Sequence, residues 1–196
     1  MIKLIIFDIG GVIIDFSDEQ FIRRVAGIKH IDWHELYETL MPLINRMHSG
    51  ALKTHEAEAV VERRFGVHHW IALWIAMYKK RARRNEKVSK LINKLSKSYK
   101  IVLLTNINRN INIQSKRPLR GLNVERIFAS CYLGMRKPEK RIYTYTLKKM
   151  VVKPSEALFI DNLEENVIGA RSAGINAVRF TGYKHLVRSL RNFGIL

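Results

Sequence analysis

The chain has 196 residues, of which 47% are hydrophobic and 27% are charged. A folded chain of this length buries about 70% of the surface that its unfolded form exposes, so it does not depend on disulfide bonds for stability. The hydrophobic and charged fractions are those of a globular protein and exclude a disordered one. The charge is unusual, because 35 Lys and Arg against 17 Asp and Glu give a formal net charge of +18. Residues 79–150 hold 21 basic and 3 acidic residues, so the excess lies in one continuous stretch. Such an excess bears on partners and solubility, and not on the fold.

The single cysteine, Cys131, excludes an intrachain disulfide and a cysteine-based zinc cluster. A buried thiol at a strand end fits a reducing cytoplasm. The apolar run from Trp70 to Tyr78 is too short to cross a membrane, and the apolar start of the chain is interrupted by Asp8. We therefore expect a cytoplasmic protein without a membrane partner.

The first apolar run, Leu4–Phe7, predicts a buried strand that ends at Asp8 and leads into Gly10-Gly11. Residues 16–97 then predict an all-helical segment. It follows the first strand's loop, so we expect it to lie over the carboxyl end of a sheet as a cap, with its last helix a candidate for the core. Helices are expected at 18–26, at 33–47 (with a capping box from Asp32 and Glu35), and at 54–65, 68–84 and 85–97.

After Ser98 the pattern changes to strands that alternate with helices. This alternation predicts a parallel sheet covered on both faces, formed by residues 1–15 and 98–196. The ligand site of such a sheet lies at the carboxyl ends of its strands. Strands are expected at 100–105, 126–131, 157–161 and 175–180, and helices at 138–150, 164–173 and 183–193.

Polar side chains end three of these strands, namely Asp8, Thr105 and Asp161, and Lys137 lies in the loop of residues 134–139. In a parallel sheet they converge in one crevice. Two carboxylates on neighbouring strand ends repel unless a cation lies between them, and Mg²⁺ suits oxygen ligands and phosphate. Asp8 is then a candidate nucleophile, while Thr105 and Lys137 are donors to phosphate oxygens. Each residue alone is also explained as a turn or a helix cap, so the prediction depends on their order and spacing.

These motifs together resemble the haloacid dehalogenase superfamily, most of whose members are Mg²⁺-dependent phosphatases that act through an aspartyl-phosphate. The resemblance spans the whole chain and implies an α/β fold, with a Rossmann-like parallel sheet core and an inserted all-helical cap. Residues 134–143 and 106–109 are similar to the α-glucose-1-phosphate phosphatase-like branch. The motifs are Phe7-Asp8-Ile9-Gly10-Gly11-Val12, Leu104-Thr105-Asn106, Gly134-Met135-Arg136-Lys137-Pro138-Glu139 and Phe159-Ile160-Asp161-Asn162.

The resemblance assigns a role to each matching position. It implies that Asp8 is the nucleophile and a ligand of Mg²⁺, together with the Gly10 carbonyl and Asp161. Glu165, about one helical turn after Asp161, is either a further metal ligand or an exposed acid at a helix start. The catalytic residues implied are Asp8, Thr105 and Lys137, and the phosphate-binding residues are Thr105, Asn106, Lys137 and Arg109.

Gly10 departs from the superfamily pattern, because most members carry a second Asp there as general acid and base. Loss of such a group costs about 10²–10⁴-fold in rate. The loss matters least for a good leaving group such as an anomeric or acyl phosphate. The dehalogenases of the superfamily also lack this Asp but carry a bulky residue in its place, so a 2-haloacid dehalogenase is the less favoured interpretation.

The sequence thus predicts a Mg²⁺-dependent phosphatase for a small phosphorylated metabolite, with a sugar phosphate as one candidate. The alternative is a catalytically weak protein on the same scaffold that binds nucleic acid or another polyanion through residues 79–150. This basic stretch includes Lys137 and Lys116, so we expect it first as an anion-attracting rim around the phosphate site. His48, beside Ser49-Gly50, is a candidate substrate contact in the cap.

Overall fold

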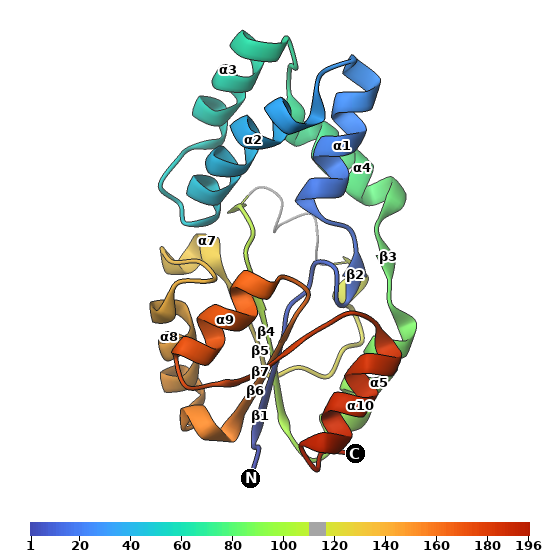
Figure 1. The fold of residues 1–196 in the computed structure, drawn as a ribbon, viewed down its shortest axis with the longest axis vertical. Helices are drawn as coiled ribbons and strands as arrows, with labels where there is room; N and C mark the ends of the chain where they lie inside the picture. Colours follow the sequence, from blue (N-terminus) through green and yellow to red (C-terminus); the bar gives the residue numbers. More distant parts are fainter. Residues whose placement is uncertain (110–116) are drawn as a thin grey trace.

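The computed structural model describes residues 1–109 and 117–196, built around a five-stranded parallel sheet in the order β5-β4-β1-β6-β7 (Figure 1). This sheet confirms the predicted α/β class. All strands run in one direction, so their carboxyl ends share one edge. The strands are β1 (Leu4–Phe7), β4 (Lys100–Thr105), β5 (Arg126–Ala129), β6 (Ala157–Asp161) and β7 (Asn176–Arg179).

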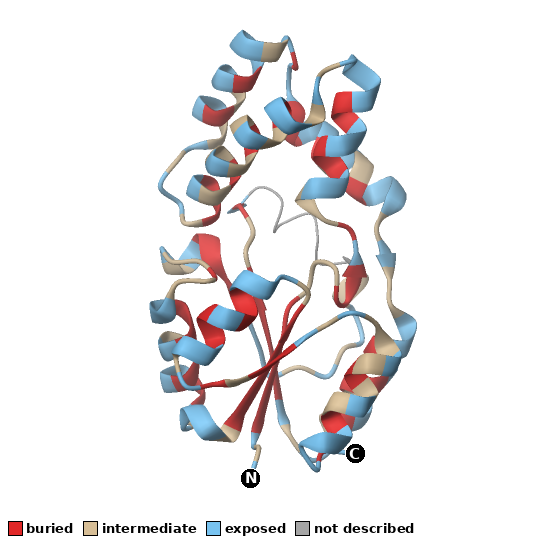
Figure 2. Ribbon diagram, in the orientation of Figure 1, coloured by how far each residue is buried: buried red, intermediate tan, exposed pale blue. Residues whose placement is uncertain are grey.

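The sheet is buried on both faces by helices (Figure 2). Ile5 and Phe7 of β1 belong to the apolar cluster with α5 and α10, whereas Leu4 and Ile6 belong to the cluster with α8 and α9. Successive side chains of a strand point to opposite faces, so one strand supplies both clusters. The covering helices are α5 (Glu86–Leu95), α8 (Lys140–Met150), α9 (Glu164–Ser172) and α10 (Tyr183–Asn192).

Four helices form a second layer beyond the carboxyl ends of the strands, at the top of Figure 1. Two short antiparallel strands carry the chain between this layer and the sheet. None of the helices in the described ranges is long and apolar enough to cross a membrane. The second layer contains α1 (Asp18–Lys29), α2 (Trp33–His48), α3 (Thr54–Phe65) and α4 (Trp70–Arg81), and the connecting strands are β2 (Ile14–Asp15) and β3 (Arg83–Arg84).

The helix expected over residues 68–84 is wrong at its C-terminal end, because Arg83 and Arg84 form β3. Arg83 lies opposite Asp15 in the antiparallel pair, which places unlike charges on facing strands. The Arg84 guanidinium donates to the Arg120 carbonyl at 2.7 Å. These contacts join segments far apart in the sequence, so helical periodicity could not reveal them.

Two smaller expectations also need correction. The strand expected over residues 126–131 stops at Ala129, and Cys131 lies in the short helix α7 (Ser130–Leu133), where burial raises the pKa of its thiol. At the start of α2, Asp32 accepts a hydrogen bond from the Glu35 backbone N–H at 2.9 Å. The Glu35 carboxylate, however, pairs with Arg64 at 3.0 Å, so the reciprocal half of a capping box is replaced by a contact with α3.

Gly169 gives a test of how tightly α9 packs on the loop that carries Lys137. A Cβ at position 169 would lie 2.5 Å from the Pro138 carbonyl oxygen, whereas one at Gly27 in α1 would meet open space. We expect Gly169→Ala to lower the free energy of unfolding by about 1–3 kcal/mol. Gly27→Ala, the matched control, should leave it unchanged or raise it by up to about 1 kcal/mol. Urea denaturation measures both, and equal effects of the two substitutions would contradict the packing.

Candidate active site

Three polar residues meet where the central strands end. Asp8 directly follows β1, Thr105 ends β4 and Asp161 ends β6. Phe7 pairs with Ile160 in the parallel register, so Asp8 and Asp161 lie side by side on neighbouring strands. The exposed fractions are only 7% for Asp8, 5% for Thr105 and 0% for Asp161. The structure thus brings together the residues that the sequence pattern placed in one crevice.

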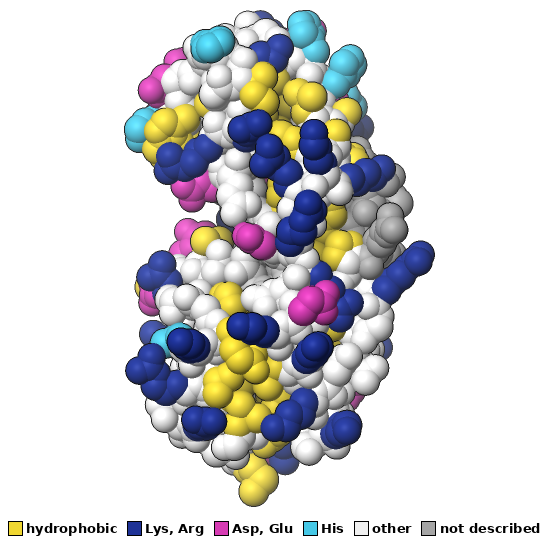
Figure 3. Space-filling view, turned by 90° about the vertical axis from the view of Figure 1, so that its right-hand side faces the viewer, with side chains coloured by type: hydrophobic (Ala, Val, Ile, Leu, Met, Phe, Trp, Pro, Cys, Tyr) yellow, Lys and Arg dark blue, Asp and Glu magenta, His cyan; other side chains and the backbone are white. Residues whose placement is uncertain are grey.

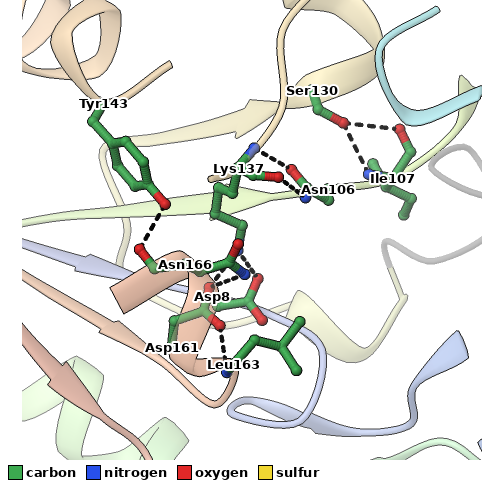
Figure 4. A network of polar contacts seen from close by, with 9 residues as sticks. All are labelled: Asp8, Asn106, Ile107, Ser130, Lys137, Tyr143, Asp161, Leu163 and Asn166. Atoms are coloured by element: carbon green, nitrogen blue, oxygen red, sulfur yellow. Dashed lines mark hydrogen bonds and ion pairs between the residues drawn. The ribbon is translucent and has the colours of Figure 1, made fainter. Parts of the chain in front are cut away.

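The Lys137 ammonium lies between the two carboxylates (Figure 4). Its Nζ is 2.6 Å from Asp8 Oδ1 and 2.7 Å from Asp161 Oδ2, and the residue is 1% exposed. Burial opposes the charged ammonium, but Asp161 and Asp8 outweigh it and raise the pKa of Lys137. Burial also raises the pKa of Asp8 to about 7, against the attraction of Lys137 and with the help of the Asp161 charge. One cation faces two carboxylates, so the site favours further positive charge.

Asp161 is held by a network that the sequence analysis missed. Its Oδ1 accepts a hydrogen bond from the Leu163 N–H at 2.9 Å, and its Oδ2 accepts one from Asn166 Nδ2 at 3.0 Å. Tyr143 OH donates to the Asn166 carbonyl at 2.8 Å. In the sequence, Asn166 is visible only as a polar residue in the first turns of the helix after Asp161. Its burial depends on tertiary packing, which the sequence pattern does not reveal.

Asn106 positions the loop that carries Lys137. Asn106 Nδ2 donates to the Lys137 carbonyl at 2.8 Å, and the Lys137 N–H donates to Asn106 Oδ1 at 2.8 Å. The side-chain amide expected to hold phosphate is therefore engaged with the Lys137 backbone. Ser130 fixes the next residue of the β4 loop, because its Oγ accepts a hydrogen bond from the Ile107 N–H at 3.0 Å.

The oxygen atoms at this end of the sheet suit a hard cation. The Gly10 carbonyl accepts no hydrogen bond from the described residues, and Asn166 Oδ1 is buried without a partner among them. Together with Asp8 and Asp161 they form an oxygen-rich set of the kind that Mg²⁺ prefers. Within residues 1–109 and 117–196, no three Asp, Glu, His or Cys side chains gather as a metal site, so Glu165 does not join the two aspartates.

Glu165 and Arg109 take no part in the hydrogen bonds and ion pairs that Asp8 and Asp161 form among the described residues. Glu165, in the first turn of α9, faces Tyr37 of α2, whose pKa is raised by burial and then by the charges of Glu19 and Glu165. Arg109 is exposed, with its guanidinium 5.3 Å from the Tyr132 ring centre, and it is absent from the lining of the cleft described next. The structure thus gives no support for phosphate binding by Arg109.

A cleft of about 620 Å³ separates the sheet edge from the second layer. Arg136 bridges its two sides, because its NH2 donates to Asn45 Oδ1 of α2 at 2.8 Å. His48, at the end of α2, is buried and lines the cleft. Burial lowers the pKa of His48 to about 4, although Asp18 opposes this shift, so the imidazole is neutral at pH 7.

The charge of the cleft is opposite to what the basic stretch suggested. On the face shown in Figure 3, Lys and Arg side chains are scattered over both layers. Among the described residues that line the cleft, Arg136 and Lys137 are the basic ones from residues 79–150, so the expected anion-attracting rim is not found there. Lys116 lies outside the described residues. The acidic side chains of the lining are Asp8, Asp18, Glu19, Glu164 and Glu165.

The chain is similar to phosphatases and to other proteins of one family. The D-ribitol-5-phosphate phosphatase of Bacteroides thetaiotaomicron is 26% identical over 180 residues, which cover 85% of this chain and 86% of that protein. Three further curated relatives match only in part, and the chain spans 9%, 13% and 28% of their lengths.

Solved structures show the same fold. A predicted HAD-like family hydrolase from Porphyromonas gingivalis matches with a TM-score of 0.75 and 27% identity, covering 97% of this chain and 98% of that one. An HAD family enzyme from Bacteroides thetaiotaomicron, in complex with magnesium and inorganic phosphate, matches with a TM-score of 0.75 and 23% identity, covering 95% and 99%. The family model for haloacid dehalogenase-like hydrolases matches residues 2–174. With this match over most of its length, the chain belongs to the haloacid dehalogenase-like hydrolases.

Proposed function

We propose that the protein is a Mg²⁺-dependent phosphatase that hydrolyses a small phosphorylated metabolite through a phosphorylated Asp8. The observation that carries the proposal is the Lys137 ammonium held between the buried carboxylates of Asp8 and Asp161, at the base of a cleft. The similarity to a D-ribitol-5-phosphate phosphatase supports the same class of reaction, and a sugar phosphate remains one candidate substrate.

The reaction that fits this geometry has two displacements at phosphorus. An Asp8 carboxylate oxygen attacks phosphorus, and the bond from phosphorus to the leaving oxygen breaks with its electron pair. The departing oxygen takes its proton from solvent, because Gly10 offers no acidic side chain. Water then attacks phosphorus, the bond to Asp8 breaks, and inorganic phosphate leaves with the Asp8 carboxylate restored.

The chain's own residues prepare these steps. Lys137 holds Asp8 in place and compensates charge that develops on the phosphoryl oxygens. The Thr105 hydroxyl, buried at the end of β4, donates to a phosphoryl oxygen, while Asn106 keeps the Lys137 loop in position. We assign α1–α4 as the cap that excludes water, and α5 to the core because it packs on the sheet.

The metal is assigned to the oxygen-rich end of this site. The carboxylates of Asp8 and Asp161 and the Gly10 carbonyl would hold Mg²⁺, which would supply positive charge to polarise the phosphoryl group. Asn166 orients Asp161 through its Nδ2 hydrogen bond. Glu165 is left out of the ligand set because it forms no three-residue cluster with the two aspartates among the described residues.

Removal of the metal tests this proposal. With Mg²⁺ we expect release of phosphate from p-nitrophenyl phosphate and from a panel of small phosphomonoesters. Excess EDTA should abolish the release, because two carboxylates then face the anionic substrate with Lys137 alone. Renewed Mg²⁺ should restore it. Release that is unaffected by EDTA would contradict the metal assignment, and no release from any ester with Mg²⁺ would contradict a phosphatase.

A further inference from the structure

We propose that this phosphatase site selects monoesters whose leaving group is an uncharged aromatic ring. The inference rests on the proposed phosphatase activity and concerns the part of the cleft beyond Asp8 and Lys137. Two observations carry it. The cleft is walled by apolar and aromatic side chains from both layers, and among the described residues of its lining the remaining charged groups are mostly acidic.

The cap wall consists of Phe16, Trp74 and Tyr78. Trp74 and Tyr78 stack with ring centres 5.1 Å apart and an interplanar angle of 10°. Phe16 packs edge-on against both rings at 5.0 and 5.4 Å. The indole N–H of Trp74 donates to Asp18 Oδ1 at 3.0 Å, so its polar atom is already satisfied. All three rings line the cleft but are only 5%, 7% and 6% exposed, so this wall adds a small apolar aromatic surface to it.

The sheet side of the cleft adds further apolar surface. Ile127 of β5 and Tyr132 of α7 both line the cleft, and they are 41% and 54% exposed, which is high for large apolar side chains. Covering such surface is favourable by roughly 25 cal/mol per Å², so a ring bound here would gain affinity that a polyhydroxylated chain would not. The other apolar side chains that line the cleft are Ile9, Ile14, Tyr37, Met41, Ile107, Leu119 and Leu163.

The charges of the cleft discriminate against a second negative group on the substrate. Asp18 and Glu165 line the cleft with no Lys or Arg ion pair among the described residues, whereas Glu19 pairs with Arg23 at 2.8 Å and Glu164 with Arg179 at 3.7 Å. Lys137 is committed to Asp8 and Asp161, so Arg136 is the one other cation of the described lining; it donates to the neutral Asn45 side chain, and its buried Nε has no partner among the described residues. A carboxylate or second phosphate on the leaving group would lose water and face like charges, which is unfavourable.

The absence of a side chain at Gly10 favours the same class of ester. Position 10 follows Asp8 on the loop after β1, and it has no acid to protonate the leaving oxygen. A phenol has a pKa of about 10, well below that of an alcohol, so an aryl oxide departs with less need of a proton donor. An aryl phosphate therefore suits both the apolar walls and the missing acid.

Binding to a variant without turnover tests the inference apart from catalysis. Asp8→Asn with Mg²⁺ would be titrated calorimetrically with inorganic phosphate, 2-naphthyl phosphate, phenyl phosphate, 4-carboxyphenyl phosphate and D-ribitol 5-phosphate. We expect 2-naphthyl phosphate to bind at least about tenfold more tightly than D-ribitol 5-phosphate, from the apolar area covered. The 4-carboxyphenyl ester should bind about tenfold more weakly than the phenyl ester.

Met41 provides the matched test of the cleft surface. In the Asp8→Asn background, Met41→Ala should weaken 2-naphthyl phosphate binding about fivefold and leave inorganic phosphate binding unchanged. Leu43→Ala, on the same helix but outside the cleft lining, should change neither. Equal binding of the naphthyl and ribitol esters, or equal effects of the two substitutions, would overturn the aromatic preference. If the wild-type enzyme still releases phosphate with Mg²⁺, that result leaves the phosphatase standing. No turnover of any ester would overturn the phosphatase itself.

Discussion

Asp8→Asn is expected to lower phosphate release by about 10⁴-fold or more without lowering the stability of the fold. The amide cannot attack phosphorus, yet its oxygen can still accept the hydrogen bond from Lys137. Burial raises the pKa of Asp8 to about 7, so the ionised carboxylate is less favourable in the folded protein than in the unfolded chain. A carboxyl with a raised folded pKa loses stability as the pH rises from the unfolded pKa, about 4, towards 7. Asp8→Asn removes the ionised carboxylate, and with it the loss of folding stability that its ionisation causes at pH 7.

The two consequences are measured separately. Turnover with Mg²⁺ reports the nucleophile, and urea denaturation at pH 7 in EDTA reports the fold. Asp15→Asn is the matched control, because Asp15 is an exposed carboxyl on β2, outside the cleft lining. It should leave turnover and unfolding nearly unchanged. Wild-type turnover in Asp8→Asn, or a clear fall in its unfolding free energy that Asp15→Asn does not share, would contradict the assignment.

The sheet and the meeting of Asp8, Thr105 and Asp161 could be predicted from sequence, for a physical reason. Each follows from a short apolar run that ends in one polar residue, and a parallel sheet places all such ends at one edge. Lys137 was recognisable because its loop carries a specific motif. These features depend on local pattern and on one topological rule, so no long-range packing had to be known.

What the sequence analysis missed depends on contacts between distant segments. The pairing of Asp15 with Arg83 joins the two connecting strands, and the bridge from Arg136 to Asn45 joins the two layers. A charge count along the chain likewise failed to describe the surface that the cleft presents. Residues 79–150 are strongly basic, but most of the described Lys and Arg side chains of this stretch lie outside the cleft lining.

Lys137→Met is expected to cause a large loss of stability. The ammonium is 1% exposed and is the cation between Asp8 and Asp161. Removing one partner of a buried ion pair leaves an uncompensated charge and costs about 3–5 kcal/mol. We expect this loss in urea denaturation with EDTA. Mg²⁺ should restore part of the stability, because its positive charge would compensate the carboxylates of Asp8 and Asp161. It should not restore turnover.

The control and a second variant separate this effect from a general loss of packing. Lys140→Met, at an exposed position at the start of α8, should change the unfolding free energy by less than about 0.5 kcal/mol. Adding Asp8→Asn to Lys137→Met leaves one buried carboxylate in place of two. The double variant should therefore gain more stability over Lys137→Met than Asp8→Asn gains over the wild type, which is the non-additive result expected for residues in contact. Equal gains in the two backgrounds would show that Lys137 acts through packing. A larger gain in the Lys137→Met background would show that repulsion between the paired carboxylates, compensated by Lys137 in the wild type, governs the stability of this site.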